Sequence, residues 1–564
     1  MKKFLSLVLA LVMTMSLVTV SAGAKDFSDD GSITYKEAVD VISGIGVVDG
    51  YPGGDFKPTE VLTRGAAAKI ICNLILGPTT ASALAASTAP FKDVPVTNTF
   101  AGYITYCSQQ GIISGYADGT FRPTGTLSGN AFMKMLLGAL GYDSAVEGYT
   151  GPNWSVAVIK QAAGIGLDDG NDEFVGSKAV TREEAALYAS NMLKATMVEY
   201  DAKTTVNVNG ATVTVAGNKA QDKAWGTATN NDGNIDDDGF VQFAEQYFDK
   251  LTLRSVVDSF GRPSNRWANK GVEIGTYPKT AGASYTENVT LGTIYADLGM
   301  TDKDEKAEVY VDGVLASELA KVSKGNDAKI ADLKFAGTDK CSVGNGTLVE
   351  AYLDEDTNDV TIACINTYVA EVNKVVAASG NKDAYITLSD TTNEGRMPAK
   401  FSPSDEFETE GFESDDIVLF TYSNADEEIK SVVKAESVTG ALSKLVLTKS
   451  VSLGEETYKF SNKYGTEYGE GRLDVDSEYV VYLDDYGYAI YVEETEYNIA
   501  DYAFLRALQS GSVVFNTDKA ALVTYDGKTK TVDTTKDYLD GVINTYANNT
   551  EKQIGYAGAK IVVT

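Results

Sequence analysis

Two arginines stand where a helix is expected to begin. Arg64 and Arg182 each directly follow a threonine that is suited to cap a helix. A cation at this positive end of the helix dipole costs roughly a few tenths of a kcal/mol or more, so each arginine needs an anion nearby. A guanidinium beside free backbone N–H groups can bind a carboxylate or a phosphate in bidentate fashion. An intrachain partner, Glu60 or Glu184, would satisfy the charge as well, and on physical grounds the two interpretations are balanced.

An acidic segment further along the chain has the ligand spacing of a calcium loop. Oxygen-bearing side chains fall at loop positions 1, 3, 5 and 12, with glycine at position 6: Asn234, Asp236, Asp238 and Glu245. Asparagine at position 1, where aspartate is normal, weakens the match, and no incoming helix or paired loop accompanies it. A solvated loop is the commoner explanation in so acidic a chain. We expect no required cofactor, and calcium stays a hypothesis for these four residues.

Catalytic chemistry finds little support in the sequence. The 564 residues include no histidine, which excludes a Ser-His-Asp triad, a Cys-His pair and a histidine-ligated zinc site. The pattern Ser431-Val432-Val433-Lys434 matches Ser-x-x-Lys but lies in a strand-like run. No carboxylate pair stands out among the acidic residues, and no nucleotide-binding loop is present. We therefore predict that the chain is not an enzyme.

The charge balance limits the partners that the chain could bind, and the cysteine spacing limits its metal and disulfide sites. There are 79 acidic and 48 basic residues, a net charge of −31, which argues against nucleic acid and anionic membranes as partners. The four cysteines show no Cys-x-x-Cys spacing. Cys72 and Cys107 lie on or beside apolar stripes and are expected to be free, buried thiols. A disulfide between Cys341 and Cys364 is left open.

The segment that ends at Arg64 recurs along the chain. The stretch from Gly50 to Arg64 returns 65 residues downstream, and a third copy lies 53 residues beyond the second. Each copy continues into an amphipathic stripe with the i, i+3, i+4, i+7, i+8 spacing of a helix. The stripes are Ala67, Ile70, Ile71, Leu74 and Ile75, then Phe132, Met135, Leu136, Ala139 and Leu140, then Ala185, Tyr188, Ala189, Met192 and Leu193.

Each unit is therefore expected to be a helix, a glycine-rich loop and a second helix. A first helix is predicted from apolar stripes around residues 35–42, 100–107 and 154–162. The second is capped by Thr63, Ser128 or Thr181, and Thr181 with Glu184 predicts a capping box. One unit cannot bury its stripes alone, so the three are expected to share a core.

At these residues the chain resembles the S-layer homology (SLH) family. The second copy carries the likeness best, with Phe91-Lys92-Asp93-Val94-Pro95 and the run Gly111-Ile112-Ile113-Ser114-Gly115-Tyr116-Ala117-Asp118-Gly119-Thr120-Phe121-Arg122-Pro123. Leu62-Thr63-Arg64 and Val180-Thr181-Arg182-Glu183-Glu184 look like the family's helix-opening motif. The likeness spans about residues 27 to 198.

The resemblance implies a three-repeat unit with pseudo-threefold symmetry, whose grooves bind secondary cell-wall polysaccharide through an acidic, pyruvylated sugar. By motif, Arg64 and Arg182 would hold the acidic group, while the groove would be shaped by Tyr51, Tyr116, Gly50 and Gly115. Two departures follow: the second copy reads Leu127-Ser128-Gly129-Asn130 without the arginine, and the third has Asp168-Asp169-Gly170 in place of Gly-Tyr. One or two grooves are thus expected to be inactive, with Lys57 or Arg122 supplying charge.

The segments before and after the repeat region differ from it in composition and in predicted structure. Residues 1–24 are typical of a secretory signal peptide, with Lys2-Lys3, an apolar stretch and the cleavage-like Ala22-Gly23-Ala24; a retained anchor is the less favoured alternative. No other stretch is apolar enough to cross a membrane.

After residue 198 short strands dominate. The cluster from Phe260 to Trp267 could stack on a sugar, but a packed turn anchored by the tryptophan is favoured.

The predicted fold class is a multidomain chain, with an N-terminal all-α-rich three-repeat domain of helix-loop-helix units followed by β-rich sandwiches or small barrels. The expected division is a signal peptide at 1–24, SLH repeats at 25–77, 91–143 and 148–198, a mixed β/α linker domain at 200–285, β-rich domains at 286–375 and 376–440, and a β-rich domain with short helices, notably near 500–508, at 441–564.

These observations together favour a secreted, non-catalytic surface protein that the three repeats anchor to cell-wall polysaccharide. The preferred role is an S-layer subunit that self-assembles into a surface lattice. A wall-tethered binding or adhesion protein without a lattice is the alternative, and a wall-acting hydrolase is the third option.

Overall fold

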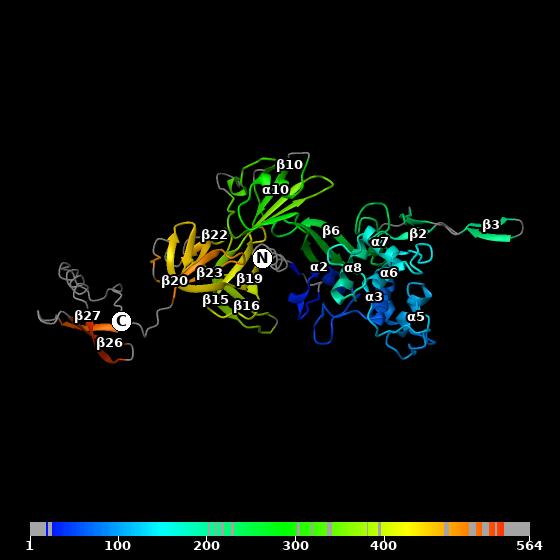
Figure 1. The fold of residues 1–564 in the computed structure, drawn as a ribbon, viewed down its shortest axis with the longest axis horizontal. Coiled ribbons are helices and arrows are strands. Elements are labelled where there is room, and N and C mark those ends of the chain that lie inside the picture. Colours follow the sequence, from blue (N-terminus) through cyan, green and yellow to red (C-terminus); the bar gives the residue numbers. More distant parts are fainter. Residues whose placement is uncertain are drawn as a thin grey trace.

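The computed structural model describes residues 19–20, 25–200, 204–208, 211–215, 219–226, 231–301, 305–316, 320–334, 341–380, 382–392, 396–466, 473–475, 477–495, 503–509, 518–524 and 527–534. Figure 1 shows the helices that precede residue 200 packed together in an elongated molecule, while α10 (Leu291–Asp297) lies in a β unit away from them. The predicted signal peptide lies almost wholly outside these residues. No helix among the described residues has the length and apolar character needed to cross a membrane.

Each repeat contributes two helices. The first gives α2 (Lys36–Gly44) and α3 (Arg64–Leu76), the second α5 (Ala101–Gln109) and α6 (Gly129–Leu140), and the third α7 (Trp154–Gly164) and α8 (Arg182–Lys194). The second helix of each repeat packs against the first helix of another repeat: α3 against α5, α6 against α7, and α8 against α2. No repeat is therefore complete by itself, and the groove walls come from different repeats.

A ring of backbone hydrogen bonds joins the three repeats just before their second helices. The N–H of Leu62 donates to the carbonyl of Val180 (2.8 Å), that of Leu127 to Leu62 (3.1 Å), and that of Val180 to Leu127 (2.9 Å). All three side chains are buried. The ring fixes the start of α3, α6 and α8 relative to one another.

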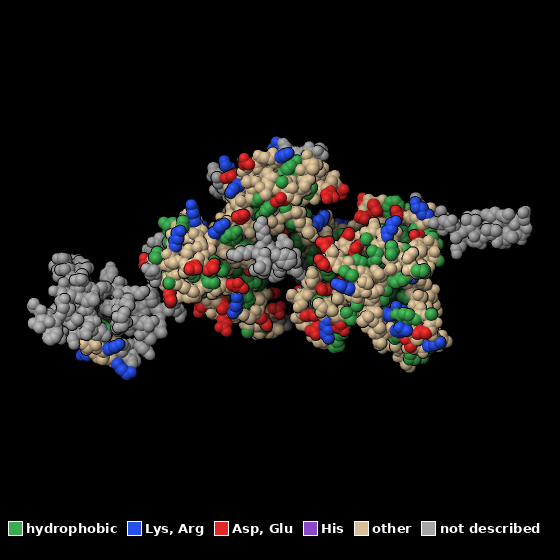
Figure 2. Space-filling model, viewed as in Figure 1, with side chains coloured by type: hydrophobic (Ala, Val, Ile, Leu, Met, Phe, Trp, Pro, Cys, Tyr) green, Lys and Arg blue, Asp and Glu red, His purple; other side chains and the backbone are tan. Residues whose placement is uncertain are grey.

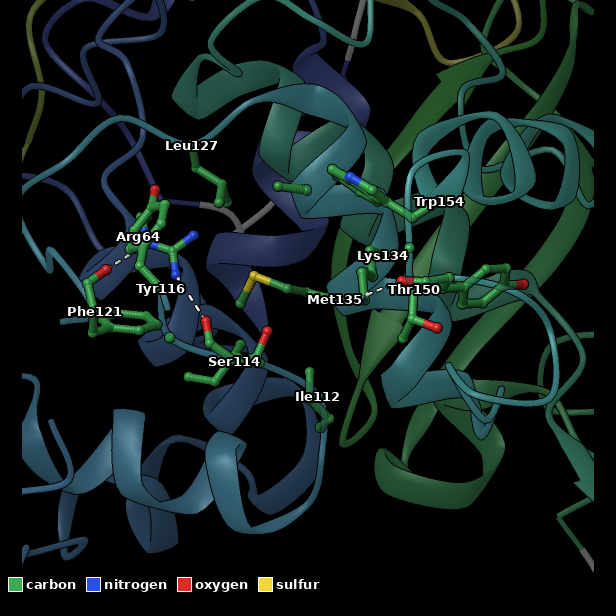
Figure 3. Close-up of a pocket in the computed structure, with 15 residues that line it drawn as sticks. Arg64, Ile112, Ser114, Tyr116, Phe121, Leu127, Lys134, Met135, Thr150 and Trp154 are labelled. Atoms are coloured by element: carbon green, nitrogen blue, oxygen red, sulfur yellow. Dashed lines mark hydrogen bonds between the residues drawn. The ribbon is translucent and has the colours of Figure 1, made fainter. Parts of the chain in front are cut away.

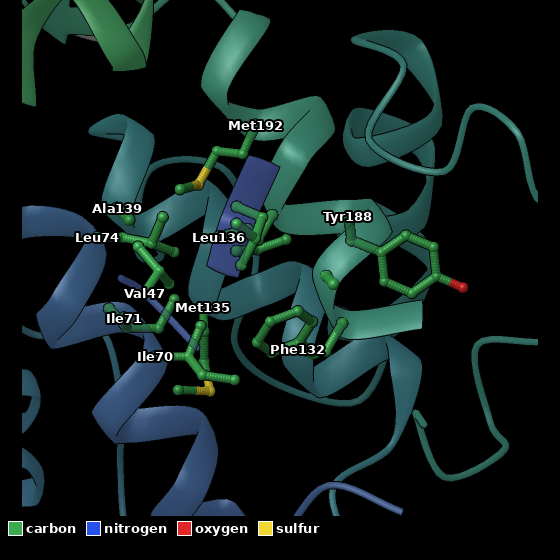
Figure 4. Close-up of a cluster of buried hydrophobic side chains, with 14 of the residues drawn as sticks. Val47, Ile70, Ile71, Leu74, Phe132, Met135, Leu136, Ala139, Tyr188 and Met192 are labelled. Carbon is green, nitrogen blue, oxygen red and sulfur yellow. The ribbon is translucent and has the colours of Figure 1, made fainter. Parts of the chain in front are cut away.

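The helix stripes meet in one core. Figure 4 shows Ile71 and Leu74 of α3, Phe132, Leu136 and Ala139 of α6, and Tyr188 and Met192 of α8 around a common centre. The side chains of Thr63, Ser128 and Thr181 accept hydrogen bonds from the third residue beyond them, and the Thr181–Glu184 capping box is formed. The predicted stripes and caps are confirmed.

A β-sheet completes the helical core. Strands β6 (Leu251–Val257), β7 (Pro263–Asn269) and β8 (Val272–Pro278) form an antiparallel sheet, with β1 (Thr19–Val20) beside β8. Trp267 is fully buried in the helical core, and its indole N–H donates to Glu37 Oε1 of α2 at 2.7 Å. The hydroxyl of Tyr277 donates to Asp40 Oδ2 on the same helix at 2.8 Å. The buried Trp267 is thus an anchor as predicted, but it lies on strand β7, and the predicted turn is limited to the residues before this strand.

The predicted fold class is wrong for the N-terminal part. Strands hold 34% of the residues against 21% in helices, and the repeat region is not a separate all-α unit. The stripes report which helix face is buried but not what covers it. Here the outer side of α2 is covered by a sheet more than 200 residues later in the chain, so helices and strands share one core. The expectation of β-rich structure further along agrees with the structure.

Three further β units follow. The first pairs β9 (Ala283–Tyr285), β10 (Glu305–Val311), β11 (Val314–Leu315), β12 (Ala320–Val322), β13 (Thr347–Leu353) and β14 (Val360–Asn366), beside α10 (Leu291–Asp297) and η2 (Ile330–Asp332). The second has β15 (Tyr368–Val376), β16 (Tyr385–Ser389), β17 (Glu406–Glu408), β18 (Ile417–Ser423) and β19 (Glu428–Lys434). The third is a closed barrel of β20 (Glu436–Val446), β21 (Ser450–Leu453), β22 (Glu456–Thr466), β23 (Glu478–Leu483) and β24 (Ala489–Glu494).

The remaining elements are short. They are β2 (Val198–Tyr200) paired with β5 (Ala220–Asp222), the hairpin β3 (Thr204–Val208) and β4 (Ala211–Val215), the sheet β25 (Ala503–Gln509), β26 (Asp518–Thr524) and β27 (Thr529–Thr534), and the short helices η1 (Asp30–Ser32), α4 (Pro78–Ser82) and α9 (Phe243–Tyr247). The helix predicted near 500–508 is wrong, because β25 is a strand paired with β26.

Candidate functional site

Arg64 is the first residue of α3, and its side chain leaves its own repeat. The guanidinium Nε donates to the carbonyl of Phe121 at 2.8 Å and Nη2 to that of Ser114 at 3.2 Å, both in the loop of the second repeat. It also lies over the rings of Phe121 and Tyr116, 4.3 and 5.1 Å from their centroids. Burial lowers the pKa of Arg64. The arginine therefore joins two repeats while one side of its guanidinium remains turned to a pocket.

That pocket, which we call the Arg64 groove, has a volume of about 380 Å³. In Figure 3, Arg64, Tyr116 and Phe121 form one wall, Lys134, Thr150 and Trp154 the facing wall, and Met135 lies between them. No aspartate or glutamate is among its lining residues. In a chain of net charge −31, whose acidic side chains are spread over the face in Figure 2, this is a local excess of positive charge beside aromatic rings.

Lys134 is the second cation of the groove and was not anticipated from the sequence. Its Nζ donates to the carbonyl of Tyr149 at 2.7 Å and lies 5.6 Å from the Trp154 ring centroid. Burial lowers the pKa of this lysine. The sequence held one indication that Lys134 is partly buried: it lies beside the apolar stripe of α6, directly before the buried Met135. Because Trp154 belongs to another repeat, the sequence spacing could not show that the Lys134 and Trp154 side chains lie close together.

The loop of the second repeat is held by Asp93. Its two carboxylate oxygens accept the backbone N–H groups of Phe121 and Arg122, each at 2.7 Å. Partial burial acts to raise the pKa of Asp93, but these bonds outweigh it and the pKa is lowered. Arg122 has a positive φ of 60°, a conformation that non-glycine residues adopt rarely, so the carboxylate stabilises an otherwise unfavourable turn.

The predicted groove glycines lie against aromatic rings, and the loop cation of the second repeat lies outside the pocket lining. A side chain at Gly115 would collide with the Phe91 ring, so the glycine lets that ring pack beneath the groove. Gly50 is in the same position against Phe27 in the first repeat. Arg122 lies over Tyr116 at 4.2 Å and pairs with Asp118 at 3.1 Å, outside the pocket lining.

Arg182 makes the equivalent contacts with the loop of the first repeat. By its equivalence to the Arg64 groove, we call the set of Arg182, Tyr51, Phe56 and Lys57 the Arg182 groove. Its Nε donates to the carbonyl of Phe56 at 2.8 Å and its Nη2 to that of Asp49 at 3.0 Å. It lies 4.8 Å from the centroids of both Tyr51 and Phe56. The Lys57 ammonium also lies over the Tyr51 ring, 4.3 Å from its centroid. Both arginines thus bridge neighbouring repeats by the same bonds.

The third groove lacks its arginine. At the start of α6, Gly129 N donates to Lys178 O at 2.9 Å and Asn130 N to Gly176 O at 2.7 Å, so the backbone contacts persist. A Cβ at Gly129 would lie 2.9 Å from the Phe174 ring, which leaves no room for a larger residue without a shift. With Asp168 and Asp169 in the loop and glycine at the first position of α6, this place lacks the arginine that the other two share.

The intrachain partners considered for the arginines are engaged elsewhere. Glu184 Oε2 accepts the backbone N–H of Thr181 within the capping box of its own helix, and Glu60 bonds the Tyr51 hydroxyl. Among the described residues neither Arg64 nor Arg182 forms an ion pair within 4.0 Å. Their structural partners are backbone carbonyls of another repeat, which neither sequence interpretation included.

The residues of the calcium hypothesis form a compact loop with a different bonding pattern. Glu245 caps α9: its Oε1 accepts Ile235 N at 3.1 Å, and its Oε2 accepts Trp225 Nε1 at 3.2 Å. Asp238 accepts Phe240 N at 2.8 Å, and Asn234 donates to Asp249 O at 3.2 Å. Burial, and then Asp238, raises the pKa of Asp236 to about 6. No cluster of three or more potential ligands occurs in the described part of the chain, and calcium binding here stays a prediction.

The Ser-x-x-Lys pattern does not assemble a catalytic pair. Ser431 and Lys434 lie on β19, where residues three apart point to opposite faces of a strand. The hydroxyl of Ser431 bonds that of Thr421 at 2.6 Å, and the Lys434 ammonium pairs with Asp416 at 2.8 Å.

The sequence matches the family model of the S-layer homology domain at residues 26–68 and 90–129. These two segments hold the loops on which Arg182 and Arg64 rest. The match covers the first two repeats, and the third, which lacks the Gly-Tyr pair, lies beyond it.

Several curated proteins are similar to part of the chain. A surface layer protein of Brevibacillus choshinensis is 26% identical over 172 residues, 30% of this chain and 15% of that protein. A cellulosome-anchoring protein of Acetivibrio thermocellus is 45% identical over 74 residues, 13% of this chain and 16% of the other. An endoglucanase of a Bacillus strain is 33% identical over 105 residues, 18% of this chain and 11% of the enzyme. The chain thus spans less than a fifth of the length of each.

Proposed function

We propose that this cell-wall surface protein, with S-layer homology domains at residues 26–68 and 90–129, is held to the wall because the Arg64 groove binds an anionic group of secondary cell-wall polysaccharide. In this proposal Arg64 and Lys134 bind the anion, and Tyr116 and Trp154 pack against the faces of the sugar rings. The anion is the acidic substituent of the sugar, such as a pyruvyl carboxylate. Binding requires no cofactor and no covalent step.

One observation carries the proposal. Two partly buried cations and four aromatic side chains line a groove that has no carboxylate, within a chain that has 79 acidic residues. Partial burial strengthens the attraction between these cations and an incoming anion, because water screens the charges less than at an open surface. The cellulosome-anchoring relative gives independent support for an anchoring role.

The finer role that we propose is that of an S-layer subunit, whose β units extend from the anchor and assemble with other copies. The surface layer relative supports this role, although it shares only part of its length with the chain. A wall-tethered binding or adhesion protein that forms no lattice is the second candidate. A hydrolase is the third; the endoglucanase match supports it, but no catalytic pair has been identified in the described residues.

Co-sedimentation with purified cell-wall sacculi tests the anchor. The mature chain should pellet with intact walls and stay in solution after the wall polysaccharide has been stripped. Lys134→Gln should weaken the association about five- to tenfold, since it removes one of two charged contacts of roughly 1 kcal/mol or more. Lys160→Gln is the matched control, because Lys160 is exposed on α7 and does not line the groove.

Equal binding of the chain to stripped and intact walls would contradict the proposal. Equal weakening by the two lysine variants would show that only net charge matters. Assembly of the purified chain into ordered sheets, seen by electron microscopy, separates the lattice role from the adhesion role, and release of soluble wall fragments would favour the hydrolase.

A further inference from the structure

Two cysteines from different repeats lie against each other in the helical core. Cys72 is on α3 and Cys107 on α5, and both are completely buried. Their sulfur atoms are 3.5 Å apart. Each sulfur also faces a carbonyl of the opposite helix, Cys72 that of Tyr103 at 3.5 Å and Cys107 that of Ala68 at 3.6 Å. The two thiols therefore meet face to face where the first repeat packs on the second.

The other two junctions between repeats hold no such pair. By the register of the second-helix caps, Cys72 corresponds to Leu137 and Ser190. Cys107 corresponds to Ile42 and Ala162, because the carbonyls of all three accept the equivalent backbone N–H in the turn after the first helix. The junctions of α6 with α7 and of α8 with α2 are thus built with aliphatic and hydroxyl side chains. A thiol is not required for packing at this position, since the same arrangement of helices forms without one.

We propose that Cys72 and Cys107 form a disulfide in the exported protein, made while the chain folds, and that this bond cross-links the first repeat to the second. The inference needs the location of the chain outside the cytoplasm, where disulfides persist, but not the binding activity of the groove. Closing the gap requires the sulfurs to approach from 3.5 Å to about 2.05 Å. A side-chain rotation can supply most of this movement.

The chemistry is a thiol–disulfide exchange with a disulfide oxidant, either a small-molecule disulfide or a surface oxidoreductase. The thiolate of one cysteine attacks the oxidant and forms a mixed disulfide, and one thiol of the oxidant leaves with a proton. The second cysteine then attacks the mixed disulfide, which releases the other thiol. In total the two cysteines lose two protons and two electrons, and the disulfide oxidant gains both and becomes two thiols.

The reaction belongs to the folding stage because the folded core shields the thiols. The contact with Cys107, together with burial, raises the pKa of Cys72, so little thiolate is present once the helices have packed. In the unfolded chain both cysteines are accessible. The bond then closes a loop between positions 35 residues apart. It also ties α3, which begins with Arg64, to the repeat whose loop forms the same groove wall.

Mass spectrometry of the refolded full chain tests the inference. A Cys341→Ala/Cys364→Ala variant leaves Cys72 and Cys107 as the sole cysteines. It is unfolded under reducing conditions, refolded with oxidised glutathione, and alkylated in denaturant. We expect no alkylation, a mass lower by about 2 Da than the reduced chain, and a proteolytic fragment that joins the two cysteines. Thermal unfolding of the helical region should move up by roughly 8–15 °C relative to the reduced protein.

One control variant and two contradicting outcomes complete the test. A further Cys107→Ala substitution should abolish both the cross-linked fragment and the thermal shift under oxidising conditions. Alkylation of both cysteines after oxidative refolding would overturn the inference. So would a mixed disulfide with glutathione at Cys72 that persists in the folded protein, because it would show that the second sulfur does not reach the first.

Discussion

The Arg64 groove and the Arg182 groove are built from the same motif but differ in their surroundings. Both arginines bind two carbonyls of the next loop and stack on its aromatic rings. Around Arg182 the nearby acids are Asp29, Asp49 and Glu60. Around Arg64 there is one acid, Asp93, and a second arginine. Three carboxylates thus act on Arg182, whereas one carboxylate and a second arginine act on Arg64.

One position, whose carboxylate in the first repeat also pairs with Lys25 at 2.6 Å, contributes to this difference. The residue before the Gly-Tyr pair is Asp49 in the first repeat and Ser114 in the second. In both loops its carbonyl accepts a bond from the arginine, so its structural role does not depend on the side chain. The side chain instead sets the charge at the rim. The comparison teaches that the arginine has a structural role in both grooves and that its neighbours decide whether it can also bind a ligand.

The largest expected effect separates the two arginines. Arg64→Ala should lower wall binding at least tenfold, whereas Arg182→Ala should lower it less than threefold, because fewer nearby carboxylates offset the charge of Arg64 than that of Arg182. Both variants lose equivalent bonds to backbone carbonyls, so each serves as the structural control of the other. Binding isotherms with sacculi, measured beside circular dichroism, check the result. Equal losses of binding would abolish the distinction between the grooves.

Exchanging the rim residues should give the next largest effect. Ser114→Asp should weaken wall binding about fivefold, since a carboxylate a few ångströms from the guanidinium in partly exposed surroundings is worth roughly 1 kcal/mol. Asp49→Ser should leave binding by the Arg64 groove intact and increase binding in an Arg64→Ala background. The effect of Ser114→Asp should shrink in high salt, where surface charges are screened. An unchanged affinity across both variants would mean that rim charge is irrelevant.

A smaller effect concerns the aspartates that hold the loops. Asp93, and Asp29 in the first repeat, each accept two loop N–H groups, which lower the pKa of both carboxyls despite partial burial. Their contribution to stability is therefore present above the ordinary pKa of 3.8 and is lost as the pH falls through the lowered value. Asp93→Asn should cost about 1 kcal/mol at pH 7, and this cost should shrink toward zero at a second pH below the lowered pKa of the Asp93 carboxyl. Thermal unfolding at the two pH values measures this, and a loss that persists at the lower pH would exclude the carboxylate as its cause.

Much of the repeat region could be predicted because its signals are local. The helix stripes, the caps at Thr63, Ser128 and Thr181, and the loss of arginine at Gly129 all follow from residues a few positions apart. The family resemblance placed Tyr51 and Tyr116 in the same grooves as the two arginines, and each ring lies beside an arginine. What the pattern did not contain was Lys134 opposite Trp154, because the two side chains belong to different repeats.

The sequence by itself determined the existence of three repeats, the buried face of each second helix and the position of each arginine at a helix start. These are consequences of helical periodicity and end effects, which act within one turn or two. The tertiary structure decided which repeat each arginine faces, which sheet covers α2 and where the charge of a groove is left without a counterion. The physical reason is that hydrophobic burial is non-directional: a stripe must be covered, but only the packing of the whole chain selects what covers it.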